Sequence, residues 1–268
     1  MQHLTAFQVA SIRILSAGII LLPVTLRHIS SIPFNKLALI FFSGTLGSLI
    51  PAYLFCVAES RIDSSLAGAL NSLTPIFAII TGALLFATNI PKGKIWGIII
   101  AFVGSILLLF NKGFIYDDNL IYSSYIVLAT LLYGVNVNLV QKYLHDVGSL
   151  KLASIALSMC AIPAFTVLYF TGYFSLPLAD KAFLISTVWS CILGVAGTAA
   201  ATVLFYILIK RAGAIFSSMV TYGIPFVAMF WGLFLGEEIT LRQVGALALI
   251  LFGIYIASRS PREITKYE

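Results

Sequence analysis

The side chain with the clearest potential for chemistry is Arg13, a cation inside a long apolar segment. It lies about eight residues, or roughly 12 Å, from the expected outer end of its helix. A charge at that depth costs about 2.5 to 3.5 kcal/mol on insertion scales, so it usually has a partner or faces water. Two interpretations follow: a structural arginine that binds carbonyls of a neighbouring helix, or a contact to a solute or counter-ion. A carboxylate would suit the forked donors of the guanidinium group.

Two prolines, Pro75 and Pro225, interrupt apolar segments at positions 150 residues apart. A proline inside a helix removes one backbone hydrogen bond and leaves a carbonyl without its usual partner. Such carbonyls line cavities or bind polar groups in membrane proteins, although a simple packing kink is the alternative. The symmetric placement of the two prolines favours the functional interpretation, because paired interrupted helices mark binding sites.

Polar side chains near these prolines complete the candidate site. At 100° per residue, Asn71 and Thr74 share one helix face beside Pro75. The same spacing places Thr221, Tyr222 and Pro225 on one face of a later helix. Hydrogen bonding between helices is the alternative role for each of these side chains. We predict a substrate cavity lined by Arg13, Asn71, Thr74, Pro75, Tyr133, Thr221, Tyr222 and Pro225.

Several other patterns limit the function. A stripe of small residues that runs from Ser190 through Gly194 and Thr198 to Ala201 predicts close helix packing rather than substrate contact. The sequence has no ATP-binding G-x-x-x-x-G-K-[ST] loop and neither an H-E-x-x-H nor a G-x-S-x-G motif. Its three cysteines lack the spacing of a metal site. We therefore predict no catalytic residue, no metal site and no cofactor.

The composition identifies the solvent around the chain as a lipid bilayer. Of 268 residues, 60% are hydrophobic and only 10% are charged, whereas soluble domains carry about 25% charged residues. The net charge of +6 does not predict nucleic-acid binding, because the cations form no cluster with interleaved aromatic residues. Nine segments approach the length needed to cross a bilayer: 5–26, 37–58, 64–87, 95–110, 121–143, 152–172, 182–209, 213–235 and 242–258.

An internal repeat organises these segments. Gly44–Leu85 and Gly194–Leu235 align without a gap, and 9 of their 42 positions are identical, including glycines and a proline. At the same offset, the segment 121–143 has no counterpart in the chain. We therefore predict an all-α, polytopic transmembrane helical bundle of nine helices in two inverted repeats, four helices plus five. The first repeat covers residues 1–111, the second covers 120–258, and 259–268 form a tail. The missing helix indicates either a truncated start or a natural variant.

The distribution of lysine and arginine predicts the orientation. If the tail is cytoplasmic, alternate loops place 11 cations inside and 4 outside, with Arg13 uncounted. This bias favours a cytoplasmic C-terminus and an external N-terminus in a bacterial inner or plasma membrane. The carboxylates Glu59, Glu237 and Glu238 then lie at external helix ends, where a solvated interfacial charge is favoured over a proton-coupling role.

Four motifs carry a resemblance to a known family. They are S-I-R-I-L-S-A at 11–17, S-L-T-P-I-F at 72–77, Y-G-I-P-F-V-A-M-F-W-G-L-F-L-G-E-E at 222–238 and R-Q-V-G-A-L-A-L-I-L-F-G-I at 242–254. In order and spacing, the chain resembles EamA-type members of the drug/metabolite transporter superfamily. The resemblance implies two inverted five-helix repeats around a central cavity that opens alternately to each side. It also implies transport of small metabolites, often outward and often driven by ion gradients. The family's first helix is absent here, and Gly236-Glu237 is replaced by Phe86-Ala87 in the first repeat.

Together these patterns predict a secondary transporter that exports a small polar or amphipathic, amino-acid-like metabolite by alternating access. Its expected partners are a small-molecule substrate, the lipid bilayer and a proton or other ion gradient, and a homodimer is compatible with the sequence. An intramembrane enzyme is not expected. The alternative is a non-transporting membrane subunit or scaffold that binds a partner protein.

Overall fold

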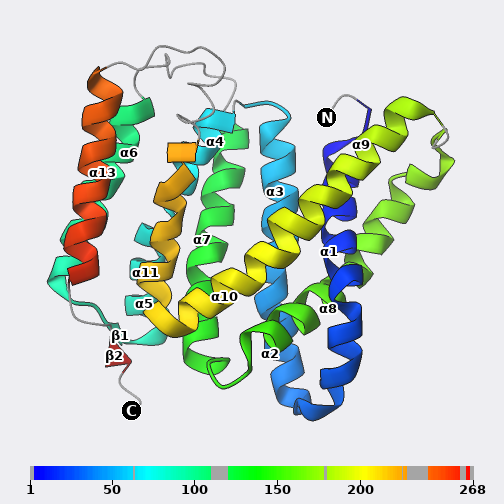
Figure 1. Cartoon of the computed structure of the whole chain (residues 1–268), viewed down its shortest axis with the longest axis horizontal. Helices are drawn as coiled ribbons and strands as arrows, with labels where there is room; N and C mark the ends of the chain where they lie inside the picture. The colour runs from blue at the N-terminus through cyan, green and yellow to red at the C-terminus, as the bar shows by residue number, and fades with distance from the viewer. Residues whose placement is uncertain are drawn as a thin grey trace. The chain divides into compact units, whose positions relative to one another are not determined.

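The computed structural model describes residues 3–62, 64–109, 120–177, 180–224, 226–227, 241–259 and 264–265. These residues are almost entirely helical (Figure 1). The α-helices are α1 Ala6–His28, α2 Phe34–Gly44, α3 Ile50–Glu59, α4 Ser64–Asn71, α5 Thr74–Phe86, α6 Lys92–Leu109, α7 Leu120–Tyr143, α8 Ser149–Phe170, α9 Lys181–Ile192, α10 Ala201–Ala212, α11 Ala214–Ser218 and α13 Leu241–Arg259. Two-residue strands β1 (Thr88–Asn89) and β2 (Ile264–Thr265) pair antiparallel.

The described residues include six helices that are long and apolar enough to cross a membrane, three of them built from consecutive helical elements. The prediction of an all-α, polytopic membrane bundle is therefore confirmed. The predicted segments 152–172 and 242–258 correspond to α8 and α13 within a few residues. Much of the predicted segment 213–235 lies outside the described residues.

The chain forms two compact units, and each takes segments from both halves of the sequence. Unit 1 consists of Met1–Ser60 and Leu139–Arg211, and unit 2 consists of Arg61–Asn138 and Ala212–Glu268. Contacts between sequence-distant helices therefore hold each unit together.

The centre of unit 1 is the antiparallel pair α1 and α8. Gln8 donates to the Thr171 carbonyl at 3.0 Å near one end, and the Thr25 and Ser158 hydroxyls bond at 2.9 Å near the other. Between them, a Cβ on Gly18 would lie 2.7 Å from the Cβ of Ala161. Glycine therefore permits the two backbones to meet, as is usual where membrane helices pack closely.

Unit 1 also contains two π-helical segments, Thr45–Leu49 and Leu193–Ala200. Each begins beside a glycine that lies against a crossing helix. A Cβ on Gly44 would lie 2.9 Å from a carbonyl oxygen of α8, and a Cβ on Gly194 would lie 2.4 Å from a carbonyl oxygen of α1. π-Helical turns are rare and are frequent at functional sites.

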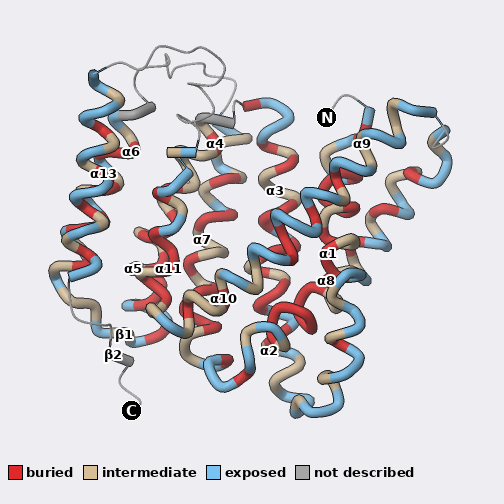
Figure 2. The backbone as a smooth tube through the Cα atoms, in the orientation of Figure 1, coloured by how far each residue is buried: buried red, intermediate tan, exposed pale blue. Residues whose placement is uncertain are grey.

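In unit 2, α6 and α13 pack through glycines. A Cβ on Gly97 would lie 2.6 Å from the Gly253 carbonyl, and a Cβ on Gly104 would lie 2.9 Å from the Ala246 carbonyl. Residue numbers rise along one helix as they fall along the other, so the pair is antiparallel. Buried and exposed positions alternate along both helices, as Figure 2 shows. The large apolar side chains on the outer faces, among them Trp96 and Phe252, suit contact with lipid.

Helix α7 lies parallel to α5 in the same unit. A Cβ on Gly134 would lie 2.7 Å from the backbone of Phe77, and the buried Asn138 amide donates to the Ala78 carbonyl at 2.9 Å and to the Thr81 hydroxyl at 3.1 Å. Asn138 also bonds to the Gly134 carbonyl of its own helix at 2.9 Å. Its amide nitrogen therefore has acceptors on both helices.

Candidate functional site

Arg13 lies in the first half of α1 and reaches across unit 1 to the second π segment. Its Nε donates a hydrogen bond of 2.6 Å to the Thr198 hydroxyl. The arginine side chain is only partly buried. Within the described part of the chain, Thr198 is the side chain or backbone group that hydrogen-bonds to this guanidinium. Since a guanidinium carries five N–H donors, four of them are left for other acceptors.

The contact depends on a close approach of α1 to the π segment. A Cβ on Gly194 would lie 2.0 Å from the Ser16 hydroxyl oxygen. That hydroxyl also donates to the Arg13 carbonyl at 3.1 Å. Gly194 therefore permits the separation at which Thr198, four residues later, meets the arginine side chain.

Helix α3 lies on another side of α1. The Ser11 and Tyr53 hydroxyls are 2.7 Å apart, and the charge of Arg13 acts on Cys56 and Glu59. Among the described side chains, Lys36 and Asp146 form an ion pair, whereas Arg13 and Glu59 do not. Arg13 thus has a carboxylate within electrostatic range but without direct contact.

Three predicted site residues meet at the junction between α4 and α5 in unit 2. Pro75 cannot donate to the Asn71 carbonyl, which an α-helix would require. The Thr74 hydroxyl donates to that carbonyl at 2.8 Å instead, and lies 3.2 Å from the Asn71 side-chain oxygen. Thr74 and Pro75 are buried, whereas Asn71 is partly buried. In this conformation, the carbonyl that the proline leaves free already has a donor.

The other predicted residues of unit 2 are separated from this junction in sequence. Tyr133 lies on α7 and is partly buried. Tyr222 is fully buried, and its hydroxyl donates to the Ile98 carbonyl at 3.1 Å. Thr221 donates to the Ser218 carbonyl at 3.0 Å. Pro225 lies outside the described residues.

One geometric prediction was wrong. Helical spacing predicted that Thr221 and Tyr222 lie on one face of a continuous α-helix. The structure instead has a 3₁₀ turn over Met219–Gly223, in which three residues complete a turn and consecutive side chains diverge by about 120°. In this turn Tyr222 is buried and Thr221 is only partly buried.

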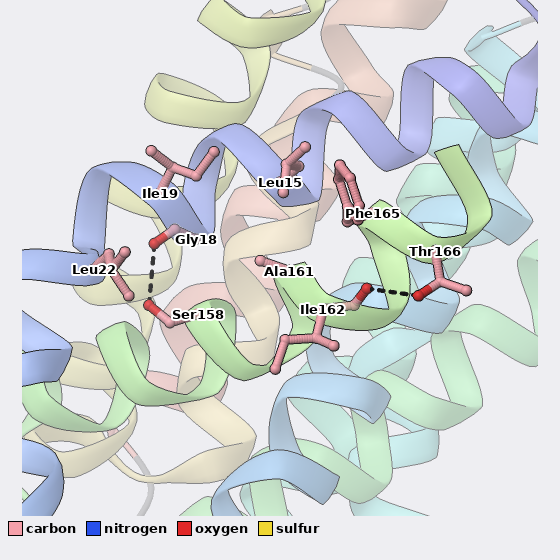
Figure 3. A pocket seen from close by; sticks show the side chains of 9 residues that line it. All are labelled: Leu15, Gly18, Ile19, Leu22, Ser158, Ala161, Ile162, Phe165 and Thr166. Atoms are coloured by element: carbon pink, nitrogen blue, oxygen red, sulfur yellow. Dashed lines mark hydrogen bonds between the residues drawn. The ribbon is translucent and has the colours of Figure 1, made fainter. Parts of the chain in front are cut away.

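A groove of about 340 Å³ lies between α1 and α8 in unit 1 (Figure 3). Its two hydroxyl groups are already engaged, Ser158 with the Gly18 carbonyl at 3.0 Å and Thr166 with the Ile162 carbonyl at 3.2 Å. The large apolar side chains at its rim are exposed, so the groove suits hydrocarbon rather than a polar solute. It is lined by Leu15, Gly18, Ile19, Leu22, Ser158, Ala161, Ile162, Phe165 and Thr166, none of which was predicted as a site residue.

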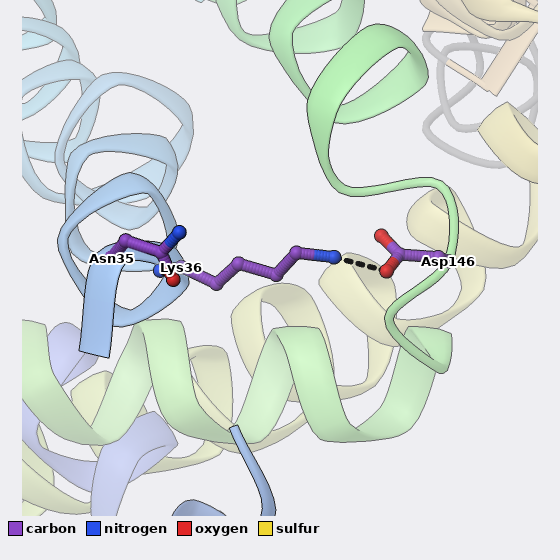
Figure 4. A network of polar contacts seen from close by, with 3 residues as sticks. All are labelled: Asn35, Lys36 and Asp146. Carbon is purple, nitrogen blue, oxygen red and sulfur yellow. Dashed lines mark hydrogen bonds and ion pairs between the residues drawn. The ribbon is translucent and has the colours of Figure 1, made fainter. Parts of the chain in front are cut away.

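Charged side chains gather at one end of unit 1. Lys36 at the start of α2 forms an ion pair and hydrogen bond with Asp146 in the connection between α7 and α8 (Figure 4). The hydrogen bond from Lys36, its charge and that of Lys210 hold the pKa of Asp146 below its ordinary value. The neighbouring His145 ring lies 3.4 Å from the Lys210 carbonyl, so α2, the connection and the end of α10 meet here.

Thr198 is the functional candidate that the sequence analysis missed. It was assigned to a small-residue stripe for packing, and its hydroxyl was not associated with Arg13. The depth of Arg13 indicated that a partner was needed, but no residue pattern identified which helix supplies it. Among the described residues, no cluster of histidine, cysteine or acidic side chains could hold a metal ion.

Comparison with known proteins gives the class of protein to which this site belongs. The EamA-like transporter family model matches residues 1–110 and again residues 120–259. The chain belongs to this family, and it is an integral, multi-pass membrane transporter with a small-molecule substrate and lipid as its surroundings.

Individual relatives agree with this assignment. The chain is 26% identical over 229 residues to a protein of Archaeoglobus fulgidus described as an uncharacterized transporter. This match covers 85% of this chain and 80% of that protein. A solved crystal structure is similar with a TM-score of 0.70 at 14% identity, covering 95% of this chain and 87% of the other. That second likeness concerns the fold alone.

Proposed function

We propose that the protein is a secondary transporter that exports a small, amino-acid-like solute by alternating access, and that Arg13 contacts this solute. The observation that carries the proposal is a cation inside a membrane span held by one described hydrogen bond. A charged donor inside a membrane span is costly unless it has an acceptor or faces water, and Arg13 is only partly buried. Water or a polar solute in a transport pathway would supply the missing acceptors.

Two features support the inverted four-plus-five arrangement over residues 1–111 and 120–258. The π segment Thr45–Leu49 corresponds, at the 150-residue offset, to 195–199 within the second π segment. At the same offset, α6 corresponds to α13, and these two helices pack antiparallel. Opposite directions of equivalent helices are what a two-fold axis in the membrane plane requires.

The proposed orientation has a cytoplasmic C-terminus in a bacterial inner or plasma membrane. In support, β2 in the tail pairs with β1 beside Lys92, a cation expected on the same side. Lys36 and Lys210 are also expected on the inside. Both lie near Asp146 and therefore at the same end of unit 1. The energy source in this proposal is a proton or other ion gradient, and a homodimer is compatible with it.

Solute flux tests the proposal. The purified full chain would be placed in proteoliposomes, loaded with individual amino acids and exposed to an imposed proton gradient. We expect flux of at least one amino acid, and a reduction of about tenfold or more in Arg13→Leu. Arg27→Leu removes an exposed cation from the end of the same helix and is expected to retain flux. If folded wild-type protein moved no solute, the scaffold alternative would be favoured instead.

A further inference from the structure

The π segment presents an acceptor to one particular atom of Arg13. The Thr198 hydroxyl oxygen accepts a hydrogen bond from Nε at 2.6 Å. A carboxylate can bind an arginine side-on, through Nε and one terminal nitrogen, or end-on, through both terminal nitrogens. With Nε occupied, the side-on mode is closed and the end-on mode is open.

We infer that Thr198 is a positioning residue that holds the Arg13 guanidinium for end-on recognition of a carboxylate on the transported solute. The inference rests on the proposed function and adds a residue and a binding mode to it. Thr198 does not itself touch the solute in this arrangement. It fixes the plane of the guanidinium, so that less side-chain freedom is lost when the solute binds.

The local backbone is suited to this role. Gly194 and Thr198 both face α1, since a Cβ on Gly194 would lie 2.4 Å from the Arg13 carbonyl oxygen and the Thr198 hydroxyl meets the Arg13 side chain. Both belong to the π segment Leu193–Ala200. The arginine is thus fixed at its backbone by close packing and at Nε by a hydrogen bond, with its terminal nitrogens left over.

The nearby charge of Glu59 fits the same assignment. Glu59 lies within electrostatic range of Arg13 but makes no ion pair with it in the described structure. It moderates the cost of the cation without occupying the terminal nitrogens. A solute carboxylate can therefore bind without first displacing a protein carboxylate from the guanidinium.

Matched solutes test the binding mode. Each standard amino acid and its carboxamide would be compared in thermal unfolding of the purified full chain, and the strongest stabiliser would be used for flux in proteoliposomes. We expect the acid to stabilise and its amide to do so at least about tenfold more weakly. Equal action of acid and amide would overturn the inference while leaving transport intact. Absence of any stabilisation or flux would overturn the proposed function as well.

Variants of Thr198 test the positioning role. Thr198→Val removes the acceptor with little change in shape and should raise the KM for the acid about tenfold, with the maximal rate within about twofold. Thr198→Ser restores the acceptor and should return KM to within about twofold of wild type. A structural role would instead lower the unfolding temperature without solute and affect acid and amide alike, and that result would overturn the inference.

Discussion

Arg13 in unit 1 and Asn138 in unit 2 are both polar side chains inside membrane-spanning helices, and they differ in how fully they are bonded. The Asn138 amide nitrogen has three acceptors within 3.1 Å, and the residue is buried. Arg13 is partly buried and makes one hydrogen bond within the described structure. Asn138 thus has acceptors for its amide donors within the protein, whereas most of the Arg13 donors have none among the described residues.

The difference separates structural from functional polarity in a membrane. A side chain whose donors are all used by neighbouring helices contributes to packing and has nothing to offer a solute. A side chain with several donors left over keeps a cost that packing alone does not offset. By this reasoning, changes near Arg13 affect transport first, and changes near Asn138 affect stability first.

The largest effect is expected from Gly194→Ala. The added Cβ would lie 2.0 Å from the Ser16 oxygen and 2.4 Å from the Arg13 carbonyl oxygen, so α1 and the π segment must separate. We expect loss of about 1 to 3 kcal/mol of stability, as for overpacked cores, together with at least a tenfold loss of flux. Thermal unfolding in detergent and proteoliposome flux would measure both.

Gly197→Ala is the matched control, since it lies in the same π segment. There the added Cβ meets only the flexible Leu193 side chain, at 3.0 Å. Flux and stability should remain close to wild type. Equal losses in the two variants would mean that any change in the π segment is disruptive, and the special role of the Arg13 contact would be lost.

A smaller effect is expected from Asn138→Leu, which should lower stability and leave flux unchanged. Removing the amide breaks the bonds to the Ala78 carbonyl and the Thr81 hydroxyl, at a cost of about 1 to 2 kcal/mol. Flux per folded molecule should stay within about twofold of wild type. Arg13→Leu should show the reverse, with little change in unfolding temperature. A strong loss of flux in folded Asn138→Leu would contradict the distinction between the two residues.

The sequence was sufficient for features that depend on composition and regular periodicity. The lipid environment, the boundaries of α8 and α13 and the place of Arg13 inside a long apolar helix all follow from runs of apolar residues. The partner of Arg13 did not follow, because Thr198 is 185 positions away and lies in a π turn that shifts the helical phase. The continuous α-helix expected around Thr221 and Tyr222 was also wrong, because a 3₁₀ turn replaces it at Met219–Gly223. Irregular turns reflect tertiary contacts that a single-helix projection does not contain.

The smallest effect is expected at the Lys36–Asp146 pair. This pair differs from both Asn138 and Arg13, because it is exposed to solvent and each charge has a partner. Its side chains are 29% and 63% exposed, so solvent screens the pair and Lys36→Gln should cost only about 0.2 to 1 kcal/mol at neutral pH. Because Lys36 holds the folded-state pKa of Asp146 below its ordinary value, the pair stabilises the fold fully above the unfolded pKa of about 3.9. The contribution is lost as the pH falls through the lower, folded-state pKa.

The unfolding temperatures of wild type and Lys36→Gln should therefore differ slightly at pH 7 and converge below about pH 3. Lys92→Gln, which removes an exposed cation from the start of α6, controls for net charge. A difference that persisted unchanged in acid would assign the effect of Lys36 to packing of its aliphatic chain. Flux at neutral pH is expected to stay unchanged in Lys36→Gln, since neither Lys36 nor Asp146 is proposed to contact the solute. A large loss of flux in Lys36→Gln would mean that this end of unit 1 also takes part in transport. It would then be wrong to infer from the exposure of a polar pair that the pair has no role in transport.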